Sequence, residues 1–143
     1  MNLLGWNCKG LRGLQAVRKV TNMVNVHKPL LIFLSETKRR TVEMDWLRAK
    51  WKFDNYFTMD CIGRVGGLSL LWMEEVKVEV MSFSKYHIDV WVGDRGDPYE
   101  WHFTGFYGEP KTNRRHHSWD LLRTLKSQST LPWFCAGDFN EIL

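Results

Sequence analysis

Short apolar runs bounded by turn residues recur along this chain and constrain its fold more than any other feature. Apolar runs of about four to eight residues are typical of buried strands, whereas helices need longer amphipathic segments. Such runs predict buried strands at residues 2–6, 30–35 and 132–137. Between residues 53 and 107 apolar side chains instead alternate with polar ones. This alternation predicts an antiparallel meander with turns at residues 63–67 and 93–98.

Three amphipathic segments between these runs predict helices at residues 14–27, 42–51 and 115–127. Pro29 ends the first helix, because proline cannot continue one. The side chains expected to face inward are Leu14, Val17, Val20 and Val24 in the first helix, Val42, Trp46, Leu47 and Trp51 in the second, and Trp119, Leu122 and Leu125 in the third. Outer helices over mostly antiparallel strands predict an α/β layered sandwich.

The length of 143 residues fits one domain with a single core. No apolar run approaches the roughly 18 residues of a membrane-spanning helix, and the N-terminus does not resemble a secretory signal, so we expect no membrane partner. Cys8, Cys61 and Cys135 are an odd number of cysteines without the Cys-x-x-Cys spacing of zinc sites. We therefore expect buried or half-buried thiols in a reducing intracellular compartment, nuclear or cytoplasmic.

The positive charge of the chain is concentrated at its start. Residues 1–40 contain eight lysines and arginines and one acid, a net charge of +7, so the remainder of this +4 chain carries −3. A basic segment of this kind suits a polyanionic partner such as DNA. A solvated charged face is an equally good interpretation of the composition.

Oxygen-bearing side chains stand where three of the expected strands end. Asn7 ends the first run, Glu36 follows the second, and Asp138 and Asn140 follow the last. Carboxylate and amide oxygens are suitable ligands for a hard cation, so these residues suggest one metal site at the edge of a sheet. Taken singly, the two asparagines also fit turns or caps, Glu36 a surface loop, and Asp138 a helix cap.

Five motifs in this order resemble the endonuclease/exonuclease/phosphatase superfamily of the apurinic-endonuclease type, and most of all the endonuclease domain of plant LINE-type non-LTR retrotransposons. The motifs are residues 5–11 (GWNCKGL), 34–38 (LSETK), 66–72 (GGLSLLW), 105–110 (GFYGEP) and 136–140 (AGDFN). The resemblance implies a four-layer α/β/β/α sandwich, of which residues 1–143 would be the N-terminal part with the C-terminal part missing. It also implies a monomer that precedes a reverse transcriptase domain.

The resemblance also implies roles for individual residues. Glu36 corresponds to the metal-binding glutamate and Asn7 to the asparagine beside it, with Mg²⁺ as the expected cofactor and Mn²⁺ as the alternative cation. Tyr107 corresponds to the tyrosine that contacts the scissile phosphate. Asp138 corresponds to the aspartate that orients or activates the attacking water, and Asn140 to its neighbour that fixes phosphate and water. Taken alone, Tyr107 also fits a core tyrosine.

Arginines at several positions are candidates for DNA phosphate contacts, which position a nucleic acid without specifying its sequence. These candidates are Arg12, Arg39, Arg40, Arg114 and Arg115. For each one, a place on a solvated face is an equal alternative.

The sequence departs from the family pattern in two ways. The family uses a catalytic histidine in a Ser-Asp-His segment, and the histidines here lack that context, so we expect them to be structural or exposed: His27, His87, His102, His116 and His117. Family members also often carry an asparagine after the phosphate-binding tyrosine, where this chain has Gly108, Glu109 and Pro110.

Three hypotheses of function follow. The first is a metal-dependent DNA endonuclease that leaves a 3′-hydroxyl to prime reverse transcription, with this chain truncated and inactive alone. The second is a non-catalytic remnant that only binds nucleic acid. The third is a phosphoesterase of the same superfamily that acts on another substrate, such as an inositol phosphate, a sphingolipid head group or RNA.

Overall fold

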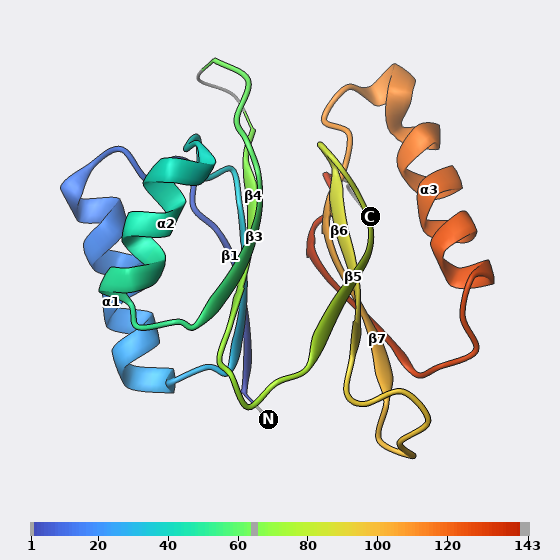
Figure 1. Ribbon diagram of the computed structural model, residues 1–143. Helices are drawn as coiled ribbons and strands as arrows, with labels where there is room; N and C mark the ends of the chain where they lie inside the picture. The colour runs from blue at the N-terminus through green and yellow to red at the C-terminus, as the bar shows by residue number, and fades with distance from the viewer. Residues whose placement is uncertain (1, 64–65, 141–143) are drawn as a thin grey trace. The chain divides into compact units, whose positions relative to one another are not determined.

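The computed structural model describes residues 2–63 and 66–140, which form two compact units, Met1–Val76 and Lys77–Leu143 (Figure 1). The first unit contains β1 (Leu3–Asn7), α1 (Leu14–His27), β2 (Leu31–Ser35), α2 (Thr41–Lys50), β3 (Asn55–Met59) and β4 (Leu68–Trp72). The second contains β5 (Val78–Ser84), β6 (His87–Val92), β7 (Trp101–Tyr107), a 3-10 turn at Thr112–Arg114, α3 (Arg115–Ser127) and β8 (Trp133–Asp138). Residues 64 and 65 of the turn expected at 63–67 lie outside the described residues.

The first unit is a four-stranded sheet in the order β1-β2-β4-β3. Strands β1 and β2 are parallel, because α1 carries the chain back to the same end of the sheet, and the other two pairs are antiparallel. All five residues of β2 are buried, as expected of a strand between two neighbours.

Helices α1 and α2 cover one face of this sheet (Figure 1). Their shared core includes Val20 of α1, Met44 of α2, and Ile32, Leu34 and Leu71 of the sheet, each with none of its surface exposed. Burial of such apolar side chains contributes about 1.5–3 kcal/mol each, so this core is the main support of the first unit.

The predicted inward face of α2 is wrong at two positions. Val42 is 82% exposed and Trp46 is 64% exposed, whereas Met44, Leu47 and Trp51 are buried. Positions 44, 47 and 51 lie on one stripe of the helix, and Val42 and Trp46 fall outside it. The Lys50 ammonium covers the Trp46 ring instead, 5.5 Å from its centroid.

Helices α1 and α3 begin and end where the sequence predicts, but one expected core side chain of each is exposed. Leu14 of α1 is 64% exposed, because it is the first helical residue and lies beyond the core. Trp119 of α3 is 40% exposed, while Leu122 and Leu125 are buried.

The second unit is a four-stranded sheet in the order β5-β6-β7-β8, with α3 beside it (Figure 1). Strands β5, β6 and β7 pair antiparallel, and α3 returns the chain so that β8 pairs parallel to β7. The single meander expected over residues 53–107 is therefore wrong. Strands β3 and β4 belong to the sheet of β2, and only β5 to β7 form a meander.

A buried polar network links β6, β7 and β8. The Asp89 carboxylate accepts a hydrogen bond from Thr104 at 2.5 Å and pairs with the ring of His102, which is 1% exposed. The Trp133 indole donates to the Thr104 hydroxyl at 2.8 Å. His87 is also buried and hydrogen-bonds Ser82 and Ser84, so His87 and His102 have structural roles.

Among the described residues, no helix has the length and apolar character needed to cross a membrane.

Candidate functional site

Asn7 and Glu36 lie at the ends of two adjacent parallel strands. Asn7 is the last residue of β1 and pairs in register with Ser35, the last residue of β2, so Glu36 follows beside Asn7. The Cys8 amide donates to the Ser35 carbonyl oxygen at 2.9 Å and extends this pairing past the strands. The two residues predicted as metal ligands thus share the carboxyl edge of the β1–β2 pair, where α/β proteins commonly bind ligands.

Hydrogen bonds from both sides fix the backbone around Glu36. The Gly10 amide donates to the Glu36 carbonyl oxygen at 2.7 Å, and the Leu11 amide donates to the Thr37 carbonyl oxygen at 2.9 Å. On the other side, the Thr37 amide donates to the Gly67 carbonyl oxygen at 3.2 Å. A Cβ at Gly67 would lie 2.2 Å from the Thr37 hydroxyl oxygen, so only glycine permits this approach.

Glu36 itself has a φ of 50°, in the left-handed region that non-glycine residues seldom occupy. Such a conformation costs of order 1–3 kcal/mol and persists where the surrounding structure determines it. Side chains held this way cluster at functional sites, so the observed outlier supports a role for the Glu36 carboxylate.

The donors at this edge fit a hard, partly hydrated cation. A carboxylate and an amide oxygen suffice for Mg²⁺, which keeps several of its waters. The Asn7 side-chain oxygen accepts the Lys9 amide at 3.0 Å, which orients it. Burial, together with the Glu36 carboxylate, raises the pKa of Cys8 to about 12, so its thiol stays protonated and is a poor zinc ligand. Within residues 2–63 and 66–140, no three His, Cys, Asp or Glu side chains form a metal-binding group.

In the second unit, Tyr107, Asp138 and Asn140 gather at the carboxyl ends of β7 and β8. Tyr107 and Asp138 are register partners in this parallel pair. The Asn140 backbone amide donates to the Asp138 carboxylate at 2.9 Å, and the Asn140 side-chain amide donates to the Gly108 carbonyl oxygen at 2.6 Å. Asn140, like Glu36, is left-handed, with a φ of 51°. The three residues therefore lie together at one strand end.

A glycine before Asp138 allows this close pairing. Gly137 has a φ of 143°, and a Cβ there would lie 1.8 Å from the Phe106 carbonyl oxygen. Any other residue at this position would push β8 away from β7. The Ala-Gly-Asp sequence thus sets the distance between the strand that carries Asp138 and the strand that carries Tyr107.

The five candidate arginines have different surroundings. Arg39 is held within the first unit, because its Nε donates to the Leu11 carbonyl oxygen at 3.0 Å and its guanidinium pairs with Glu43. The hydrogen bond from the Arg39 guanidinium to the Glu43 carboxylate lowers the pKa of Glu43. The exposed candidates are Arg12, Arg40 and Arg114, and Arg115 is half-buried.

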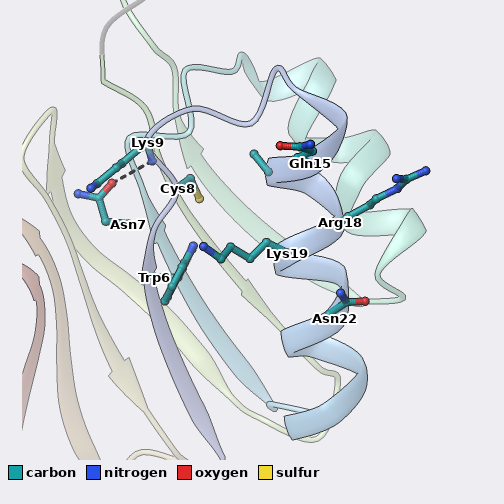
Figure 2. Close-up of a pocket in the computed structure, with 9 residues that line it drawn as sticks. Trp6, Asn7, Cys8, Lys9, Gln15, Arg18, Lys19 and Asn22 are labelled. Carbon is teal, nitrogen blue, oxygen red and sulfur yellow. Dashed lines mark hydrogen bonds between the residues drawn. The ribbon is translucent and has the colours of Figure 1, made fainter.

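A groove of about 810 Å³ between β1 and α1 was not predicted from the sequence (Figure 2). Trp6, Lys9, Arg18 and Lys19 line it, and the Lys19 ammonium lies 5.5 Å from the centroid of the Trp6 ring. Among the described residues that line the groove, none is acidic. The sequence signal for this groove was the basic pair in the helix that follows Trp6. Composition alone could not distinguish this pair from a solvated charged face.

The sequence profile described as the endonuclease/exonuclease/phosphatase family matches residues 4–143. A comparison with curated protein sequences gives no match. The fold is similar to the endonuclease domain of TRAS1, a telomere-specific non-LTR retrotransposon, with 14% identity and a TM-score of 0.67 over 99% of this chain and 59% of that one.

Two further solved structures are similar. D. rerio TDP2, complexed with a single-strand DNA product, has 18% identity and a TM-score of 0.71 over 98% of this chain and 61% of its own. The human Nocturnin catalytic domain, with a bound sulfate anion, has 14% identity and a TM-score of 0.66 over 96% and 62%. The chain thus spans about three fifths of the length of these structures.

These likenesses confirm the predicted fold class, a mixed α/β sandwich, here with two four-stranded sheets and three helices. The profile match covers nearly the whole sequence. The chain therefore belongs to the endonuclease/exonuclease/phosphatase family.

Proposed function

We propose that this chain provides the N-terminal part of a Mg²⁺-dependent endonuclease that nicks DNA and leaves a 3′-hydroxyl. The main support is the occurrence of oxygen-bearing side chains at the carboxyl ends of both parallel strand pairs. Asn7 and Glu36 end β1 and β2, and Tyr107 and Asp138 end β7 and β8. A turn alone requires none of these groups, and family membership makes a phosphoester the expected substrate class.

Each side chain has a chemical role in this proposal. Glu36 and Asn7 hold the cation, which when bound supplies charge stabilisation to the phosphoryl and leaving oxygens. The Asp138 carboxylate orients the attacking water and accepts its proton. The Tyr107 hydroxyl donates a hydrogen bond to a non-bridging phosphate oxygen. The Asn140 backbone amide fixes the position of the Asp138 carboxylate, and the Asn140 side chain helps to fix the phosphate and the water.

Two similar structures support DNA as the substrate. One is a retrotransposon endonuclease domain and the other is complexed with a single-strand DNA product. The net charge of +7 on residues 1–40 favours the same partner. We propose a plant LINE-type element as the source, with a reverse transcriptase downstream, on the basis of the motifs at residues 66–72 and 105–110.

Plasmid nicking by the full-length protein that carries this sequence tests the proposal. We expect supercoiled plasmid to be nicked only with Mg²⁺ or Mn²⁺. We expect Glu36→Gln to reduce the nicking rate by at least about 100-fold, because the cation loses a negatively charged ligand. Glu75→Gln, at an exposed position of the same unit, is the matched control. An unchanged nicking rate in Glu36→Gln would show that Glu36 is not a metal ligand.

A non-catalytic nucleic-acid-binding remnant is the second candidate, and the histidines favour it. His87 and His102 are buried in structural hydrogen bonds, while His27, His116 and His117 are exposed at helix ends. This candidate predicts salt-sensitive DNA binding by the 143-residue chain without nicking at any metal concentration. Nicking by that chain above its Glu36→Gln variant would eliminate the remnant hypothesis. A panel of other phosphoesters, tested on the full-length protein, would identify a different substrate class.

A further inference from the structure

The segment after β7 is held by two residues from other elements. The Tyr86 hydroxyl, between β5 and β6, donates to the Glu109 carboxylate at 2.6 Å, while the Tyr86 carbonyl oxygen accepts the Tyr107 amide at 2.7 Å. The Ser118 hydroxyl of α3 accepts the Glu109 amide at 2.8 Å. Tyr86, Glu109 and Ser118, which we call the Glu109 clamp, thus fix residues 107–109 from two directions.

The Glu109 carboxylate is buried, with 5% of the residue exposed. Burial of a charge is unfavourable unless hydrogen bonds replace its water. Here one oxygen accepts from Tyr86, and the other accepts the Lys111 amide at 3.2 Å. The hydrogen bond from Tyr86 lowers the pKa of Glu109, so the carboxylate stays ionised. A segment that only reverses the chain direction does not need a buried carboxylate.

The other side of the same segment contacts the backbone of Asp138 and the side chain of Asn140. The Gly108 amide donates to the Asp138 carbonyl oxygen at 2.6 Å, and the Gly108 carbonyl oxygen accepts the Asn140 side-chain amide at 2.6 Å. Glu109 is therefore one residue from a direct contact with Asn140 and two residues from Tyr107. A shift of this segment moves Tyr107 and Asn140 together.

We propose that Glu109 is a positioning residue, which acts with Tyr86 and Ser118 to set the Tyr107 hydroxyl and the Asn140 amide for phosphodiester cleavage. This inference rests on the proposed function, and it gives a role to the residue that occupies this segment instead of the asparagine common in the family. Catalytic groups tolerate little displacement, because a misplacement of about 1 Å lowers rates by up to about 100-fold.

The first test measures nicking kinetics in the full-length protein that carries this sequence. Glu109→Gln and Tyr86→Phe are each expected to lower kcat by about 10-fold to 100-fold while KM for DNA changes less than about twofold. The double variant is expected to be no slower than the slower single variant, because Glu109→Gln weakens and Tyr86→Phe removes the same hydrogen bond. The matched control is Glu79→Gln, which breaks the exposed ion pair between Glu79 of β5 and Arg95. This variant is expected to keep the wild-type kcat. Unchanged kcat in Glu109→Gln or Tyr86→Phe would overturn the proposal.

The second test is independent of catalysis. In the same ¹⁵N-labelled protein, Glu109→Gln and Tyr86→Phe are expected to shift or broaden the side-chain amide resonances of Asn140, and Glu79→Gln is not. If the parent protein cuts no DNA, the proposed function fails, and the Asn140 resonances alone decide the positioning role. Asn140 resonances that stay in place in a folded clamp variant overturn that role, whatever the nicking assay gives. If Glu109→Gln does not fold, Tyr86→Phe carries both measurements.

Discussion

Left-handed residues mark both groups of candidate catalytic side chains. Glu36 and Asn140 have φ values of 50° and 51°. Glu36 follows β2 beside Asn7 of the paired strand β1, and Asn140 follows β8, which carries Asp138. Asparagine adopts this conformation comparatively often, whereas glutamate seldom does. The left-handed conformation of Glu36 is therefore more informative than that of Asn140. The sequence indicated where Glu36 lies, at the end of an apolar run. Its conformation depends on contacts with Gly10 and Gly67, which are far away in the sequence and therefore could not be predicted.

Because Glu36 is left-handed, we expect the usual order of stability of alanine and glycine variants to be reversed at this position. We expect Glu36→Gly to be more stable than Glu36→Ala by about 1 kcal/mol, because only glycine is unstrained at this φ. At Glu79 in β5, the order is expected to be the opposite, since glycine weakens a strand by roughly 0.5–1 kcal/mol. Urea denaturation of the four variants checks both. Equal stability of the two Glu36 variants would mean that the left-handed conformation is absent in solution.

The Glu109 carboxylate is expected to make the stability of the folded protein depend on pH. Its pKa in the folded protein lies below the ordinary value of 4.5, so its contribution to stability is fully present above that value and is lost as the pH falls through the folded pKa. We expect the stability difference between the parent and Glu109→Gln to be constant near pH 7 and to shrink as the pH falls below 4.5. Denaturant unfolding at several pH values measures this. A difference that stays constant down to pH 2 would contradict a charged Glu109 in the folded state.

Secondary-structure elements were predicted well where the pattern is local and poorly where it depends on partners. Helices α1 and α3 end at the predicted residues, because their amphipathic period is written in consecutive positions. The face of α2 was wrong, since Val42 and Trp46 are apolar but exposed. The meander was wrong, because alternation predicts strands without naming their neighbours, and β4 pairs with β2 instead of β5. The positions of Asn7, Glu36 and Asp138 at strand ends were predicted from the sequence, but the expectation that they share the edge of one sheet was wrong, because β8 belongs to the second sheet. The Glu109 clamp required a contact across 23 residues.

Because of the buried network on β6, β7 and β8, we expect the loss of a buried carboxylate to lower the free energy of unfolding more than the loss of an exposed one. Asp89→Ala leaves His102 and Thr104 without their shared acceptor, so we expect a loss of about 3–5 kcal/mol in the free energy of unfolding. Asp94→Ala, which removes an exposed pair with Lys77, is expected to change it by about 1 kcal/mol or less. Urea unfolding of the two variants gives the comparison, and a small loss in Asp89→Ala would show that the network adds little.

Over the whole molecule, charge is distributed unevenly, and the most basic stretch is the one that forms β1, α1 and β2. The groove between β1 and α1 displays part of this charge on a surface with an aromatic ring, a combination typical of nucleic-acid contacts (Figure 2). A sequence count establishes the charge but not its arrangement. Only the fold separates the lysines and arginines that line the groove from Arg39, which is used within the unit.

The groove predicts a change in the salt dependence of DNA binding. Replacing both Arg18 and Lys19 with glutamine is expected to weaken binding and to reduce the slope of log K against log salt by about one to two, because up to two phosphate contacts are lost. The matched control replaces Arg123 and Lys126 of α3 with glutamine. Fluorescence anisotropy with a labelled oligonucleotide, over a series of salt concentrations, measures both slopes. Equal slopes in the two double variants would exclude the groove as a DNA contact.

Within the described residues, no strand of one sheet pairs with a strand of the other, and this has a consequence for synthesis on the ribosome. Every described strand pair of the first sheet joins residues between Leu3 and Trp72, and every described pair of the second joins residues between Val78 and Asp138. The first sheet can therefore complete its pairing as soon as Trp72 leaves the exit tunnel, before most of the second unit has been translated. Glu36 would already hold its strained conformation on the nascent chain, with the Gly10 and Gly67 contacts in place.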